Sequence, residues 1–122
     1  MGHPTIYPTG VTVYNPEKCW NGFTIFQALE VGAVLMNMNG RENKVWKGVH
    51  GFPNKIFPGG YLMTSRGSRD GRYGVQDGLD LVQIDWDGNV VWKFDRNEYI
   101  EDPGIPGRWM ARSHNDYQRE GS

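Results

Sequence analysis

Cysteine, charge of one sign and long apolar runs are all scarce in this chain of 122 residues. The lone Cys19 cannot form an intrachain disulfide, and it has no second cysteine with which to hold a metal ion. Thirteen basic residues against fourteen acidic ones give a net charge of −1, so no overall field favours nucleic acid or an anionic membrane. We therefore expect neither partner, no metal and no other cofactor.

Segments that cross or target membranes are missing as well. No apolar stretch approaches the length needed to span a bilayer, and the N-terminus has neither the basic nor the apolar region of a signal peptide. These absences predict a soluble protein whose export signal, if it has one, was removed or lies outside this chain.

Glycine and aromatic residues are plentiful instead. The chain holds 17 Gly, 5 Trp, 6 Tyr and 5 Phe, a composition that suits short strands and tight turns better than helices. About 38% hydrophobic and 22% charged residues further indicate a folded chain that can bury a core. We therefore expect an all-β fold.

One hairpin pattern occurs twice. Residues 81–94 place Asp87-Gly88 between two runs rich in β-formers, which is typical of a hairpin with a type I′ turn. An imperfect copy surrounds Asn39-Gly40, and aligning its Trp46 with Trp92 gives a spacing of 46 residues. A period of roughly 40–50 residues with four strands in each unit is typical of a propeller blade.

The rest of the chain divides around these hairpins. Residues 1–32 read as an N-terminal segment of extended chain and short strands, at Val11–Tyr14 and Phe23–Phe26. Residues 33–122 read as propeller blades, with one complete blade at about 50–94 that includes a second hairpin, turning at Pro58-Gly59-Gly60. The next blade begins at about 108, after a stretch with two prolines that we expect to be irregular.

About two blades of four-stranded antiparallel sheet make only a partial propeller. Closure takes about four to eight blades, and isolated repeat units leave their faces uncovered. We therefore expect another chain, or sequence beyond these residues, to supply the remaining blades.

Several motifs together resemble the N-terminal part of the arylsulfotransferase family. They are Tyr7–Lys18, Asn21–Phe26, the hairpin Val34–Trp46, Phe57–Met63, Leu81–Phe94 and Arg112–Tyr117. The resemblance implies a β-propeller enzyme, periplasmic or secreted, that transfers a sulfuryl group from an aryl sulfate ester to a phenolic acceptor without a nucleotide donor. It also implies channel-facing histidines, one transiently sulfated, and a helping arginine.

Two histidines fit this chemistry. His50 follows Trp46, and His114 follows Trp92 after an insertion, so each would open the innermost strand of a blade and face the channel. Arg112 lies two residues from His114 and would share its face of a strand. Histidine can act as nucleophile or general acid, and arginine binds oxyanions. The alternative is a histidine that caps a strand and bonds to a neighbouring blade.

Three arginines, Arg66, Arg69 and Arg72, lie in a glycine-rich loop together with Asp70. They could bind the anionic aryl sulfate substrate or a nucleic-acid phosphate, or the loop could simply be solvated. A non-catalytic propeller segment that serves binding or assembly is the alternative function of the chain as a whole.

Two further patterns have both a functional and a structural interpretation. Residues 85–89 superficially suggest a calcium loop, but they lack the remaining oxygen ligands and the distant glutamate, so a hairpin turn is the better interpretation. Trp46, Trp86 and Trp92 could form a stacking platform for an aromatic substrate, whereas the repeat position of Trp46 and Trp92 favours packing between blades.

Overall fold

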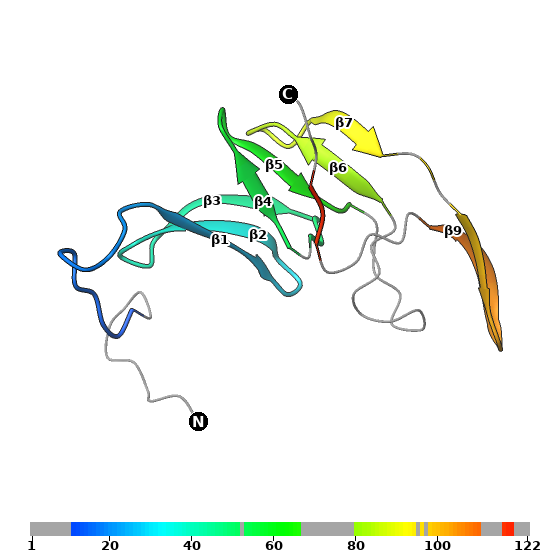
Figure 1. The fold of residues 1–122 in the computed structure, drawn as a ribbon, viewed down its shortest axis with the longest axis horizontal. Coiled ribbons are helices and arrows are strands. Elements are labelled where there is room, and N and C mark those ends of the chain that lie inside the picture. Colours follow the sequence, from blue (N-terminus) through cyan, green and yellow to red (C-terminus); the bar gives the residue numbers. More distant parts are fainter. Residues whose placement is uncertain are drawn as a thin grey trace.

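The computed structural model describes residues 11–51, 53–66, 80–94, 96, 98–110 and 116–118. Within these ranges it contains strands and turns and no helix, which confirms the all-β prediction for this part of the chain (Figure 1). The strands are β1 (Phe23–Ala28), β2 (Gly32–Asn37), β3 (Glu42–Lys47), β4 (Lys55–Phe57), β5 (Tyr61–Thr64), β6 (Leu81–Ile84), β7 (Val90–Phe94), β8 (Glu98–Asp102) and β9 (Ile105–Met110).

These strands form three antiparallel sheets. The first sheet has the order β1-β2-β3, the second has the order β4-β5-β6-β7, and β8 pairs only with β9. Neither of the two larger sheets is closed on itself. The first and second sheets lie next to each other, and the β8–β9 hairpin stands apart from both at the right of Figure 1.

All three predicted hairpins are present, but the turn after β6 is not of type I′. That type needs a positive φ at both central residues, whereas Gly88 has a φ of 91° and Asp87 is not among the residues with positive φ. The Gly88 N–H donates to the Asp85 carbonyl, and the strand pairing shifts beside Ile84. A longer turn with a bulge thus joins β6 to β7.

The two hairpin copies share one register, and their offset differs from the predicted one. Asn37 and Asp85 begin equivalent turns, and each accepts a hydrogen bond from the glycine N–H three residues later. Counting from these turns, equivalent positions lie 48 residues apart, so Trp46 matches Phe94 rather than Trp92. The predicted spacing of 46 residues was wrong because it aligned identical side chains instead of strand positions.

The two larger sheets stack through opposite faces. Ala33, Leu35 and Trp46 share one face of the first sheet, which we call its front face. They pack against Leu62, Val82 and Ile84 of the second sheet, all almost fully buried. In the first sheet, the positions equivalent to Val82 and Ile84 are Val34 and Met36, on its back face. The front of one sheet therefore meets the back of the next.

Two expectations about the strands were wrong. Val11–Tyr14 forms no strand, and Val13 is 87% exposed, so β propensity without a pairing partner did not produce a strand. The stretch expected to be irregular contains β8 and the first half of β9. There Pro103 and Gly104, whose φ is 80°, form the turn of a hairpin instead of interrupting the structure.

Candidate functional site

The structure locates only part of the predicted site. His50 and Arg66 lie within the described residues, whereas His114, Arg112, Arg69 and Arg72 lie outside them. The candidate site is therefore built around His50 and the segment 116–118, which follows His114 in the sequence.

His50 lies in the connection from the first sheet to the second, between β3 and β4. Its backbone N–H donates to the Ser65 carbonyl at 2.7 Å, and its side chain is half-buried. Val49 before it and Gly51 after it are both buried. The backbone of the histidine is thus held in the connection, and β4 begins only at Lys55, so the prediction that His50 opens a strand was wrong.

A polar network surrounds this connection and joins the two sheets. The Thr64 hydroxyl donates to Asn54 Oδ1 at 2.7 Å, and Asn54 Nδ2 donates to Gln27 Oε1 at 2.9 Å. Gln27 Nε2 donates in turn to the Val49 carbonyl at 2.9 Å. Asn54 and Thr64 are buried, and buried polar groups that are fully hydrogen-bonded hold a unique arrangement. The network therefore fixes the backbone next to His50.

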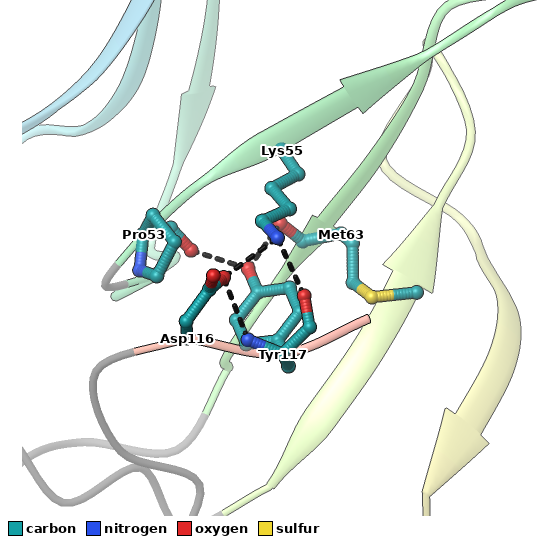
Figure 2. A network of polar contacts seen from close by, with 5 residues as sticks. All are labelled: Pro53, Lys55, Met63, Asp116 and Tyr117. Carbon is teal, nitrogen blue, oxygen red and sulfur yellow. Dashed lines mark hydrogen bonds and ion pairs between the residues drawn. The ribbon is translucent and has the colours of Figure 1, made fainter. Parts of the chain in front are cut away.

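The segment 116–118 docks on the same region from the other side (Figure 2). The Tyr117 hydroxyl lies at hydrogen-bond distance from the Pro53 carbonyl and, at 2.8 Å, from the Met63 carbonyl. Lys55 Nζ donates to the Tyr117 carbonyl at 2.6 Å, pairs with Asp116 at 2.6 Å and lies 5.4 Å from the Tyr117 ring centroid. In Figure 1 this segment is red and passes beside β4.

The charges of this second cluster follow from its contacts. The hydrogen bond from Lys55 and the N–H of Tyr117 lower the pKa of the Asp116 carboxyl, so it stays ionised. Burial, and secondarily the negative charge of Asp116, raise the pKa of the Tyr117 phenol well above its usual range. Tyr117 is therefore a neutral hydroxyl at physiological pH, which can donate a hydrogen bond to a backbone carbonyl.

Arg66 sits at one end of the glycine-rich loop. Its side chain is exposed, and its backbone N–H donates to Asp80 Oδ1 at 2.7 Å. The Ser65 hydroxyl donates to the same carboxylate oxygen at 3.0 Å. Asp80 thus ties together the two ends of the loop through the backbone of Arg66 and the hydroxyl of Ser65.

The turn at residues 85–89 uses its carboxylate for local structure. Asp85 accepts hydrogen bonds from the backbone N–H groups of Asp87 and Asn89 and from Asn89 Nδ2, at 2.8–3.0 Å. The Asn89 side chain is the main reason that the pKa of Asp85 is lowered. In the described part of the chain, no group of three or more His, Cys, Asp or Glu side chains could hold a metal ion.

Of the two tryptophans predicted to pack between units, Trp46 does so and Trp92 does not. Trp46 is 3% exposed, and its ring meets that of Trp86 edge to face at 5.3 Å. Its indole N–H donates to the carbonyls of Asp85 and Trp86, in the turn of the second sheet. Trp92 is half-buried, on the opposite face of the second sheet from Val82. The three rings therefore do not share one surface.

Sequence reasoning missed Gln27, Asn54, Lys55 and Tyr117. The first three are single polar residues without a motif, and their partners lie 10 to 62 residues away along the chain. Tyr117 belongs to a predicted motif, Arg112–Tyr117, but its docking on β4 had no signal in the sequence.

Comparisons with family models, curated proteins and solved structures returned no match. None of the described residues form a helix that could cross a membrane.

Proposed function

We propose that this chain forms successive blades of a propeller-type aryl sulfotransferase, with His50, His114 and Arg112 at a site that faces the central channel. The observation on which the proposal rests is the convergence of two segments beside β4. Tyr117, three residues after His114, bonds to the carbonyl of Pro53, three residues after His50. Each histidine is thus close in sequence to the same contact.

The stacking of the sheets supports the propeller part of the proposal. An interface between the front of one unit and the back of the next is repeated head to tail, and such interfaces build rings when the rotation closes. The front of the second sheet carries a further segment, because Lys55, which shares that face with Met63, pairs with Asp116. Further blades, from another chain or from more sequence, would complete the ring.

The proposed reaction has two steps on one histidine. A neutral imidazole nitrogen attacks the sulfur of the aryl sulfate, an N–S bond forms, the S–O bond to the ring breaks, and a second histidine protonates the leaving phenolate. The oxygen of the acceptor phenol then attacks the sulfur, gives its proton to the second histidine, and displaces the first. Arg112 would stabilise the negative charge on the sulfuryl oxygens.

Sulfuryl transfer is tested on the complete protein with 4-nitrophenyl sulfate as donor and phenol as acceptor. We expect release of 4-nitrophenolate together with phenyl sulfate, and a loss of at least about 100-fold in His114→Asn, as for removal of a nucleophile or a general acid. His3→Asn is the matched control, because His3 lies in the N-terminal segment. Unchanged release in His114→Asn, or no release by the wild type, would contradict the proposal.

A non-catalytic role in assembly is the second candidate, and one observation favours it. Phe26 on the back face of the first sheet is 40% exposed, although the equivalent position in the second sheet, Thr64, is fully buried by the first sheet. A position that is covered in one unit and partly exposed in the other favours a further partner at that position, next to Val34, which is itself buried on the same face. Light scattering after size exclusion tests this role: a folded monomer without bound chains would argue against it.

A further inference from the structure

The β8–β9 hairpin presents two large aromatic rings to solvent, apart from both larger sheets (Figure 1). Tyr99 is 54% exposed and Trp109 is 66% exposed, and the two residues are direct cross-strand partners. Contact between the rings stabilises the pairing of the strands, but it leaves more than half of each side chain in water. Two adjacent exposed rings form an apolar patch, and such patches are typical of binding sites.

The edges of the hairpin are poorly suited to bind a further strand. β9 contains Pro106, which has no N–H to offer, and the pairing is irregular between Ile100 and Asp102. β8 carries Glu98 and Glu101, both exposed, and charged residues on an edge also disfavour strand addition. The face that carries the rings is therefore the more suitable surface for a ligand.

The two rings form a corner and not a flat platform. Their centroids lie 5.7 Å apart, and their planes are inclined at 63°. A flat sugar or nucleobase cannot stack on both rings at this angle. A compact cation, in contrast, can lie within about 6 Å of both centroids, which is the range of cation–π attraction. Aromatic rings set at an angle around a quaternary ammonium group are the usual cage for such ligands.

A carboxylate side chain lies on the same face as the rings. A Cβ at Gly107 would collide with the Tyr99 hydroxyl and would come within 2.7 Å of Glu101 Cγ, so both side chains lie over this glycine. Glu101 is exposed, and across the residues that the structure describes it forms no ion pair; the ion pair found there joins Lys55 to Asp116. Its negative charge is therefore available to a cationic ligand.

The charge of the whole hairpin has the same sign. Residues 98–110 hold three acidic residues and one arginine, an excess that attracts a small cation and repels a nucleic-acid phosphate. Within the described ranges, the cation–π contacts are made by Lys44 and Lys55, on rings outside the hairpin. No described lysine or arginine thus occupies the corner between the two rings.

We infer that the face formed by Tyr99, Trp109 and Glu101 binds a quaternary ammonium group, such as the trimethylammonium group of choline. The methyl groups would lie against the two rings, and the carboxylate would supply the opposite charge. The group can belong to a free small molecule or to a lipid headgroup. The inference uses no residue of the proposed sulfuryl-transfer site and does not depend on that reaction.

Two probes of equal shape separate charge from apolar contact: choline and 3,3-dimethyl-1-butanol, in which carbon replaces the charged nitrogen. Each is titrated into the full chain by calorimetry, with tryptophan fluorescence as a second signal. Choline should bind saturably, at least about fivefold tighter than the neutral probe, which is the order of an exposed cation–π contact, and more weakly in high salt. Phosphatidylcholine vesicles identify the source: co-sedimentation in addition to choline binding assigns a lipid headgroup, and choline binding alone assigns a free ligand.

Ring-removing and charge-removing variants show whether choline binds at this face. Trp109→Leu should weaken choline binding by about fivefold, and Glu101→Gln by about threefold. The matched controls are Trp20→Leu and Glu17→Gln, because Trp20 is 95% exposed, Glu17 is exposed, and both lie outside the hairpin. Circular dichroism checks that each variant is folded, and Glu101→Gln decides if Trp109→Leu is not. No saturable choline binding, equal affinity for the neutral probe, or equal affinities in Glu101→Gln and Glu17→Gln would each overturn the inference.

Discussion

The first and second sheets share one backbone plan but bury different side chains at equivalent positions. Trp46 of β3 and Phe94 of β7 occupy matching places, yet Trp46 is 3% exposed and Phe94 is half-buried. Trp46 lies against the turn of the second sheet and donates its indole N–H to two carbonyls there. The turns therefore set the strand register within each sheet, whereas burial of a front-face side chain depends on what packs against that face.

The two sheets also differ in how they begin. The second sheet starts with the short edge strand β4, and the connection that precedes it carries His50 and the buried Asn54. In the first sheet, β1 is the edge strand, and residues 11–22 before it form no strand. The candidate site thus belongs to the junction between units, where the network of Gln27, Asn54 and Thr64 and the contacts of Lys55 with Asp116 and Tyr117 meet β4 and β5.

Trp46→Ala should have the largest effect among the variants that compare the two sheets. It leaves a cavity and removes the donor of the Asp85 and Trp86 carbonyls, so the free energy of unfolding should fall by about 3–5 kcal/mol. Phe94→Ala, at the half-buried equivalent position, should cost only about 1–2 kcal/mol. Urea denaturation followed by circular dichroism measures both, and equal losses would show that the two faces are equally packed.

Gly51→Ala tests the junction itself. A Cβ at this buried position would lie 2.0 Å from Asn54 Oδ1 and 2.6 Å from Thr64 Oγ1, so the Asn54 side chain must move and lose its hydrogen bonds. We expect a loss of about 2–3 kcal/mol in urea denaturation. Gly22→Ala, where a Cβ meets nothing within 4 Å, should stay within about 0.5 kcal/mol of the wild type. Similar values for both would contradict the network.

Tyr117→Phe tests whether segment 116–118 docks on the second sheet. Loss of the hydroxyl removes the single O–H hydrogen that the Pro53 and Met63 carbonyls share, which should lower the free energy of unfolding by about 1 kcal/mol. Tyr61→Phe, at an exposed position in β5, is the matched control and should be neutral in the same denaturation experiment. Docking would be refuted if the two variants were equally stable.

Asp85→Asn should have the smallest effect on stability. It makes the two turns alike, because Asn37 already accepts the backbone hydrogen bonds of the first turn with its amide oxygen. The pKa of Asp85 is lowered in the folded state. Its contribution to stability is therefore present above its unfolded pKa of about 3.9 and lost as the pH falls through the folded value. The melting temperature of the wild type should fall more than that of Asp85→Asn between pH 6 and pH 2.5; parallel curves would exclude this role.

Local turn chemistry made much of the fold predictable. Glycines 40, 59, 60 and 88 marked three hairpins, and all three are present with positive φ at these glycines. The same local reading failed at Pro103-Gly104, because proline was taken as a strand breaker although it can form the turn of a hairpin. It also failed for the repeat spacing, because the prediction aligned Trp46 with Trp92 instead of aligning the two turns.

The candidate site was predictable only where the repeat carried a signal. His50 was singled out through its position after Trp46, but it lies in the connection before β4, which begins at Lys55, and not in a strand. Gln27, Asn54 and Thr64 meet only because the front of one sheet packs on the back of the next. Such contacts depend on the stacking of the sheets, and single polar residues far apart in the sequence do not reveal it.

The head-to-tail stacking of the two sheets is tested most directly by the indole N–H resonance of Trp46. This resonance, assigned by its loss in Trp46→Phe, should exchange slowly with solvent, because the N–H lies 3.1 Å from the Trp86 carbonyl oxygen and 3.3 Å from that of Asp85. It should also show nuclear Overhauser contacts to protons of Trp86 and Asp87 in the other sheet. Rapid exchange, with contacts confined to β2 and β3, would contradict the stacking that supports the propeller part of the proposed function.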